Sequence, residues 1–210
     1  MTPRRKFVRP LGERRYRKLF VIAVEGTVTE PQYFQLFQRC EPVIHVACLP
    51  PKKGSSPLHV LAELKKYLHN EHFTEIDEAW LVVDKDMWTD AQLHELLLWS
   101  RTSENYGFAL SNPKFEFWLL LHYEDGRRAN SSQECSNRLK RYIPYYNKGI
   151  DIRKITDEMI QQAITRARQK DTPPSIDWPH TNGTTVYRLV ERILAPMPKK
   201  EISELTNQCR

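Results

Sequence analysis

The sequence predicts an α/β fold: a mostly parallel four-stranded sheet with helices on both faces, followed by a helical C-terminal segment. Between residues 19 and 126, short apolar segments alternate with segments whose apolar residues recur at helical spacing, as in parallel strands joined by crossover helices. Beyond residue 126 only the helical spacing continues. A chain of 210 residues is long enough to bury one such core.

Four apolar segments are the predicted strands, and each is followed by polar or turn residues. They are residues 19–24, 43–49, 79–83 and 107–111. The third is a continuous apolar run, which is typical of a strand buried on both faces by covering helices.

The predicted helices of the sheet region begin near Thr29, Pro57 and Asp90, and then just after the fourth strand. At that last position Asn112 is expected to be the N-cap and Pro113 the first helical residue, where a missing N–H has no cost. Three more helices are predicted in the C-terminal segment, at residues 132–142, 151–168 and 184–194.

The composition is that of a soluble globular protein, with 40% hydrophobic and 28% charged residues. No apolar run approaches the ~20 residues that span a bilayer, so we expect no membrane segment. The four cysteines have no C-x-x-C spacing, which favours reduced thiols in a cytoplasmic protein.

The net charge of +6 is unevenly distributed. Residues 1–18 hold eight Lys or Arg and one acid. Residues 19–126 hold eight bases and sixteen acids, and residues 127–170 hold eleven bases and four acids. We therefore divide the chain into a basic N-terminal arm (1–18), an α/β domain (19–126) and a helical extension (127–210). An acidic centre suits a cation and basic flanks suit a polyanion, although basic tails are often only solubilising.

Acidic residues follow two of the predicted strands. Asp84 and Asp86 come directly after the third strand, and in extended backbone this spacing points both side chains the same way, ~6.6 Å apart. Glu25 follows the first strand, and Gly26 permits a tight turn there. We expect these two strands to be neighbours, so that the carboxylates meet outside the strand ends and bind Mg²⁺ or Mn²⁺. The alternative is that the aspartates only cap the next helix.

Three further residues are candidates for the same site. Glu116 is the only acid in a predicted helix that is apolar nearly all round, so it needs a cation, a base or a hydrogen-bond donor beside it. It is either a metal ligand or half of a structural ion pair. Glu30 and Asn112 are candidates to support the ligands, although for Glu30 we favour the simpler role of a first-turn acid that complements a helix dipole.

Six basic residues are candidates for contacts with substrate phosphates. They are Lys52, Lys53, Arg127, Arg128, Arg138 and Arg141. The two lysines lie in a loop whose solvation explains them equally well. Tyr142, Tyr145 and Tyr146 follow the arginines, and such tyrosines either stack on unpaired nucleobases or belong to a core.

Three stretches resemble the RloB-like family and, more broadly, the Toprim fold of topoisomerases, primases and OLD-type nucleases. They are Glu25-Gly26-Thr27-Val28-Thr29-Glu30-x-x-Tyr33-Phe34, Asp84-x-Asp86 and Asn112-Pro113-x-Phe115-Glu116-x-Trp118-Leu119-Leu120-Leu121-His122. The resemblance is close over residues 19–125. The Toprim pattern alone is short, and the combination of all three stretches is much more specific.

The resemblance implies a metal-dependent nuclease that cleaves phosphodiester bonds of DNA or RNA in a prokaryotic anti-phage, abortive-infection-like system. Asp84 and Asp86 would hold Mg²⁺ or Mn²⁺, and Glu25 would bind a second ion or act as a general acid or base. The resemblance also implies an ATPase partner encoded nearby. Since this sequence has no P-loop, any use of ATP would belong to that partner.

Two other classes of function fit part of the pattern. A haloacid-dehalogenase-like phosphatase also has two aspartates after a strand, but Trp88 stands where its signature has Thr or Val, and no G-D-x-x-x-D follows. The second class is a non-catalytic subunit with the same fold that binds nucleic acid or regulates an ATPase. The intact acids favour the nuclease over both.

Overall fold

The computed structural model of the chain describes residues 18–38, 44–50, 56–86, 88–144, 146 and 149–195. The predicted basic arm, apart from Lys18, lies outside the described residues, and so do Lys52, Lys53 and Tyr145. Among the helices in the described part of the chain, none is long and apolar enough to cross a membrane.

The predicted α/β class and the mostly parallel sheet are confirmed, with one strand more than expected. The sheet has the order β2-β1-β3-β4-β5, and β1, β2, β3 and β4 run parallel. The strands are β1 (Lys18–Val24), β2 (Ile44–Leu49), β3 (Glu78–Asp84), β4 (Tyr106–Asn112) and β5 (Gly183–Thr184). The expected pairing of the first and third strands is confirmed, because β1 and β3 are neighbours in register.

The prediction that no strand follows residue 126 was wrong. The short strand β5 pairs antiparallel with the end of β4, Gly183 opposite Asn112 and Thr184 opposite Ser111. The hydroxyls of Ser111 and Thr184 lie 2.8 Å apart. A strand of two residues in a polar segment has no alternation of apolar residues by which a sequence could reveal it. This pairing joins the C-terminal segment directly to the sheet.

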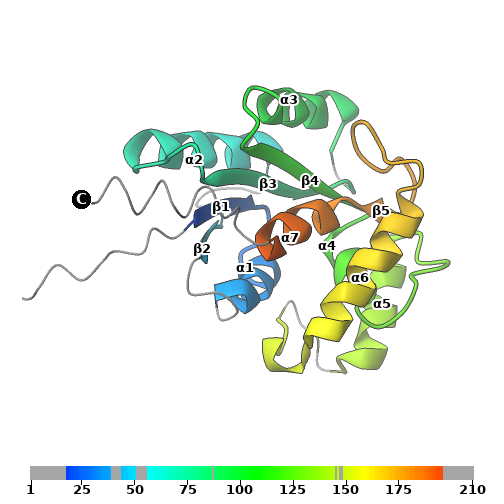
Figure 1. The fold of residues 1–210 in the computed structure, drawn as a ribbon. Helices are drawn as coiled ribbons and strands as arrows, with labels where there is room; N and C mark the ends of the chain where they lie inside the picture. Colours follow the sequence, from blue (N-terminus) through cyan, green and yellow to red (C-terminus); the bar gives the residue numbers. More distant parts are fainter. Residues whose placement is uncertain are drawn as a thin grey trace, which may run out of the picture.

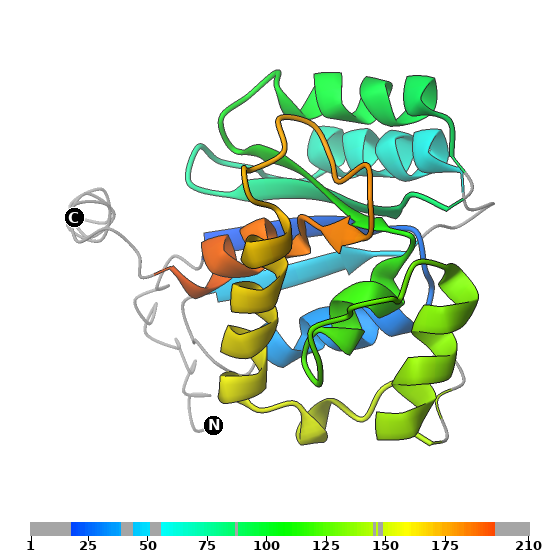
Figure 2. The ribbon, with the colours of Figure 1, turned by 90° about the vertical axis from the view of Figure 1, so that its right-hand side faces the viewer.

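Helices cover both faces of the sheet (Figure 1). One face is covered by α2 (Pro57–Asn70) and α3 (Asp90–Ser100), and the other by α1 (Thr29–Phe34), α4 (Phe115–Leu120) and α7 (Val186–Leu194). Two short 3₁₀ helices, η1 (Gln35–Gln38) and η2 (Ile152–Lys154), lie in the connections. Beyond α4 lie α5 (Ser132–Tyr142) and α6 (Asp157–Lys170), on the side away from α2 and α3 (Figure 2).

Alternating side chains of one strand enter two separate cores. In β1, Phe20 and Ile22 pack in the core with α4 and α7, whereas Val21 and Ala23 pack in the core with α2 and α3. This is the period-two geometry of a strand whose two faces are both covered. The apolar run of the third predicted strand is buried in the same way, as its sequence indicated.

The predicted start of the helix after the fourth strand was wrong by two residues. Asn112 is the last residue of β4 and not an N-cap, because its backbone pairs with Gly183 and its side-chain amide donates to the Pro179 carbonyl at 2.9 Å. A residue before proline is also biased toward extended backbone. The helix α4 begins at Phe115, after Lys114.

Candidate functional site

The acidic residues after β1 and β3 lie together at the carboxyl ends of these strands. Glu25 Oε2 accepts a hydrogen bond from the Asp84 backbone N–H at 3.2 Å. The Trp88 indole N–H also donates to the Glu25 carboxylate, at 3.1 and 3.2 Å from its two oxygens. The turn after β1 therefore brings Glu25 to the end of β3.

Asp84 lies at the centre of this group of acids. Its Oδ1 accepts from the Phe115 backbone N–H at 2.8 Å, so Asp84 satisfies the first turn of α4 and not that of the next helix in the chain. Burial raises the pKa of Asp84 well above its usual value, and the carboxylates of Glu30, Glu25, Glu116 and Asp86 raise it further, in that order. Five acids thus share one electrostatic environment.

Asp86 stands at the exposed edge of the group. Its Oδ2 accepts from the Ser132 hydroxyl, in the first turn of α5, at 3.1 Å. Its backbone N–H donates to the Pro113 carbonyl at 3.0 Å. Asp86 therefore connects the strand end to the helical extension.

Glu30 occupies the interior of the group, which the sequence did not lead us to expect. Its side chain folds back so that Oε1 accepts from the Gly26 N–H at 3.1 Å, and the residue is only 6% exposed. A Cβ atom at position 26 would lie 2.0 Å from Glu30 Oε2, so only glycine leaves room for this carboxylate. Burial, with the charges of Glu116 and Glu25, raises the pKa of Glu30 to about 7. The pairing of Gly26 with an acid four residues later was the available sequence signal.

Glu116 has features of both alternatives that the sequence allowed. It is 7% exposed and forms an ion pair with Lys114, whose Nζ lies 3.6 Å from Oε1. The same oxygen accepts from the buried Tyr146 hydroxyl at 2.9 Å. Glu116 also faces the central acids, because its charge contributes to the raised pKa of both Asp84 and Glu30.

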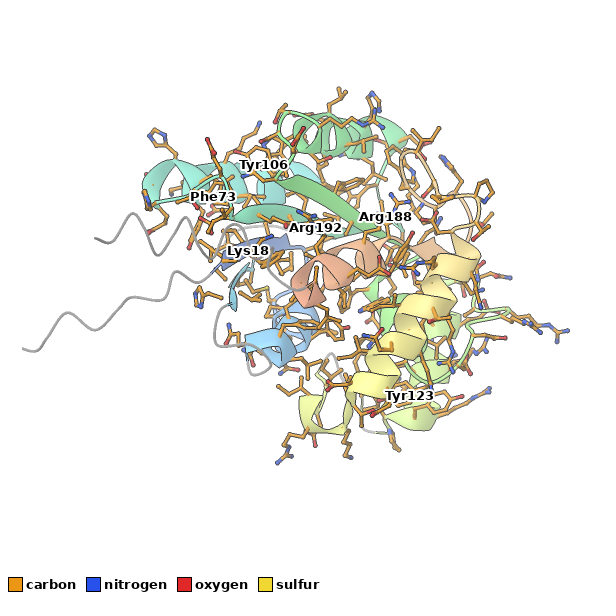
Figure 3. The ribbon with its side chains drawn as sticks, viewed as in Figure 1. Lys18, Phe73, Tyr106, Tyr123, Arg188 and Arg192 are labelled. Atoms are coloured by element: carbon orange, nitrogen blue, oxygen red, sulfur yellow. The ribbon has the colours of Figure 1, made fainter. Side chains whose placement is uncertain are left out.

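A buried carboxylate at the opposite end of the sheet shows what a purely structural acid looks like in this fold. Burial alone would raise the pKa of Glu78, but hydrogen bonds from Arg192, Lys18 and Trp80 lower it below the usual value. Lys18 of β1 and Arg192 of α7, both labelled in Figure 3, form ion pairs with Glu78. The N–O distances are 2.8 and 2.6 Å. A hollow of about 460 Å³ opens beside these residues, and its Arg188 and Arg192 are already paired with acids.

Whereas Glu78 is surrounded by bases, Asp84 and Glu30 have other acids as their charged neighbours. Whether these carboxylates fit a cation depends on the chemistry of their oxygens. Their oxygen-only donor set matches the preference of Mg²⁺ and Mn²⁺. In the described residues, no three His, Cys, Asp or Glu side chains stand in an arrangement that could hold a metal ion as they are. Each carboxylate instead accepts from an N–H or O–H group of the protein. The chemistry of the donor set fits a divalent cation, and a bound ion would have to draw these carboxylates closer together.

Asn112, the other candidate support residue, fixes the C-terminal segment. Its amide holds the loop before β5 through the Pro179 carbonyl, at 2.9 Å. The backbone of the neighbouring Pro113 accepts from Asp86. Asn112 therefore lies beside the site without contacting a carboxylate through its side chain in any hydrogen bond of the described residues.

The predicted basic residues differ in their exposure and in whether they form ion pairs. Arg138 is partly exposed, and its guanidinium is held by Glu124 and by the Arg127 carbonyl. Arg127 is largely exposed and paired with Asp125 at 2.9 Å. Arg128 and Arg141 are exposed and make no ion pair with any residue that the structure describes.

The tyrosines separate into the two roles that the sequence left open. Tyr142 is 42% exposed and stacks on Tyr123, with ring centroids 4.8 Å apart and planes at 15°. Tyr146 is 6% exposed and lies in the core, where its hydroxyl contacts Glu116. Tyr142 thus keeps a ring surface available to a ligand, and Tyr146 does not.

Comparison with known proteins bears on the identity of the chain. A family model described as RloB-like protein matches residues 20–193. No curated protein and no solved structure gives a significant match. The matched segment contains the sheet except the first two residues of β1, all five acids of the site and the helical extension as far as the penultimate residue of α7. Because it covers most of the 210 residues, the chain belongs to the RloB-like protein family.

Proposed function

We propose that this protein is a divalent-metal-dependent nuclease of Toprim type that cleaves phosphodiester bonds of DNA or RNA. The observation that supports the proposal most is the group of five carboxylates outside the ends of β1 and β3, in which the charges of neighbouring acids help to raise the pKa of Asp84 and Glu30. Ligand sites of open α/β sheets lie at such strand ends. Family resemblance adds a role in a prokaryotic anti-phage, abortive-infection-like system with an ATPase partner encoded nearby.

The roles of the residues follow from their contacts. Glu25, Asp84, Asp86 and Glu116 would hold Mg²⁺ or Mn²⁺, and the buried Glu30 is the charge that most raises the pKa of Asp84. When bound, such an ion neutralises charge on a phosphodiester and polarises its oxygens. The protein supplies the orientation: Phe115 N–H fixes Asp84, Ser132 fixes Asp86, and Tyr146 fixes Glu116. Holding reacting groups in place in advance is itself a large part of catalysis.

Substrate contacts in this proposal come from the helical extension and not from the acidic sheet region. Arg128 and Arg141 are exposed and form no ion pair in the described residues. Arg127 would have to give up its exposed ion pair with Asp125 to bind a phosphate. Surface pairs of this kind contribute little, so a phosphate can replace the acid. The exposed ring of Tyr142 offers a stacking surface to an unpaired base.

The test is cleavage of mixed DNA and RNA substrates with Mg²⁺ or Mn²⁺ by the wild-type protein and by Asp84→Asn. Asparagine can still accept from Phe115 N–H, so the fold should survive, while the ligand charge is lost. Since ligation is worth several kcal/mol of transition-state stabilisation, we expect activity to fall roughly 100-fold or more. Asp157→Asn, which replaces an exposed acid in the first turn of α6, is the matched control.

A non-catalytic subunit that binds nucleic acid or regulates an ATPase is the second candidate. It is favoured by the fact that each carboxylate of the site already has a protein donor. This alternative predicts salt-dependent binding of nucleic acid with no cleavage under any metal condition, and Asp84→Asn would then bind as the wild type does.

A further inference from the structure

We propose that Tyr146, which belongs to the helical extension, is a positioning residue that holds one carboxylate oxygen of Glu116, so that the other oxygen is available to a divalent cation. The proposal rests on the metal site of the proposed function and adds to it a residue outside the acidic sheet region. It assigns to the helical extension a part in building the site.

The Tyr146 hydroxyl joins the two helices that carry Glu30 and Glu116. It donates to Glu116 Oε1 at 2.9 Å and lies 3.3 Å from the Thr29 hydroxyl. A phenol has one proton, and Glu116 receives it, so Thr29 is the donor in the second contact. Thr29 is the first residue of α1, next to Glu30, and Glu116 is the second residue of α4. One buried hydroxyl therefore fixes the first turns of both helices relative to each other.

The contacts on Glu116 are confined to one of its two carboxylate oxygens. Oε1 receives the Tyr146 hydroxyl and faces the Lys114 ammonium at 3.6 Å. Lys114 is itself held by the Ser136 hydroxyl of α5 at 2.8 Å. No group in the described residues donates to Oε2. Binding by one oxygen leaves the other directed and available, which is what a supporting hydrogen bond does for a carboxylate ligand.

Hydrogen bonds of the neighbouring backbone also hold Tyr146 near α1. The Ile150 backbone N–H donates to Gln32 Oε1, in α1, at 2.8 Å, and the Tyr146 N–H donates to the Ile143 carbonyl at 2.9 Å. Burial and the neighbouring Glu116 carboxylate raise the pKa of the Tyr146 phenol, so it stays a proton donor at neutral pH. Tyr146 is thus held in place independently of Glu116 and can act as a support.

The chain offers a matched control for this hydrogen bond. Tyr187, in α7, is 5% exposed and donates from its hydroxyl to Asp171 Oδ2 at 2.8 Å. Tyr146→Phe and Tyr187→Phe each remove one buried hydroxyl from a bond to a carboxylate and keep the ring. A general loss of stability should therefore be similar in both variants, while an effect on cation binding should appear in only one.

The experiment is calorimetric titration of Mn²⁺ into the full chain of the wild type and both variants, with urea unfolding as a check on the fold. We expect Tyr146→Phe to bind Mn²⁺ about 10-fold more weakly than the wild type, the lower end of the effect of losing a ligand's supporting partner. Tyr187→Phe should bind as the wild type does. Equal Mn²⁺ affinity of Tyr146→Phe and the wild type, or an equal loss in both variants, would overturn the proposal.

Nucleic-acid cleavage by the same three proteins separates this inference from the proposed function. Mn²⁺ binding that depends on Tyr146 in a wild type that cleaves nothing would support the positioning role and refute the nuclease. Cleavage and Mn²⁺ binding that both ignore Tyr146→Phe would keep the nuclease and refute the positioning role. A wild type that binds no Mn²⁺ would refute the positioning role together with the metal site.

Discussion

Replacing Glu30 with glutamine is expected to stabilise the protein at alkaline pH, even though the substitution falls in the centre of the candidate site. Burial of the side chain is the main reason why the pKa of this carboxyl is raised to about 7 in the folded protein, whereas its ordinary value is 4.5. The amide oxygen of glutamine can accept from the Gly26 N–H as the carboxylate does. The substitution therefore removes the charge and keeps the hydrogen bond.

The magnitude follows from proton linkage. Between pH 4.5 and 7 the folded state holds a proton on Glu30 that the unfolded chain has released, so the contribution of this group to stability falls as the pH rises. Each unit of pKa corresponds to ~1.36 kcal/mol, so the full effect by pH 8 is roughly 3 kcal/mol. The Glu30→Gln protein should not lose this stability as the pH rises. At pH 4, where Glu30 is neutral, the variant and the wild type should have similar unfolding free energies.

Urea unfolding in EDTA at several pH values from 4 to 8 measures the difference directly. Glu95→Gln, in which an exposed glutamate of α3 is replaced, is the control for a general effect of removing one negative charge. A difference in unfolding free energy between Glu30→Gln and the wild type that does not change with pH would refute the argument from burial. A variant that is less stable than the wild type at pH 8 would show that the ionised carboxylate stabilises the fold.

Three further outcomes are expected. Gly26→Ala places a Cβ where the Glu30 carboxylate lies and should destabilise the protein by about 1–3 kcal/mol in urea unfolding, and the cost should shrink in a background with Glu30→Ala. Charge reversal of Arg128 and Arg141 should weaken binding of a nucleic acid and reduce the slope of its salt dependence in fluorescence anisotropy, with unchanged binding arguing against this surface. Glu116→Gln should lower Mn²⁺ affinity about 10–100-fold in calorimetry, while an unchanged affinity would return Glu116 to a purely structural pair with Lys114.

The sheet was predictable because its strands are buried on both faces. Segments such as 19–24 and 79–83 must be apolar at every position in that setting, and continuous apolar runs are easy to recognise. The strand β5 has the opposite character, since its two residues are placed by the Asn112 and Ser111 partners across the sheet and by no pattern of their own. The helix after β4 was misplaced for a related reason, because Asn112 serves this pairing rather than a helix cap.

The acids of the site were found in the sequence where they directly follow a strand. Glu25, Asp84 and Asp86 do so, and the parallel order of β1 and β3 then places them at one edge. Glu30 was undervalued because its position depends on a side chain folding back over Gly26, which a sequence pattern does not report. The role of Tyr146 was ambiguous for the same kind of reason, since a tyrosine beside basic residues has the same sequence context on a surface and in a core.

The position of α7 has a consequence for how this chain folds during its synthesis. Residues of β1, the first described strand, share one core with Val186, Leu189 and Val190 of α7, the last described helix. One face of the sheet is therefore completed by residues made about 170 positions after those it covers. Such contacts over long sequence separations form slowly, and until α7 has left the ribosome that apolar face is covered only in part, by α1 and α4. We expect nascent chains that stop before α7 to aggregate or to be held by chaperones.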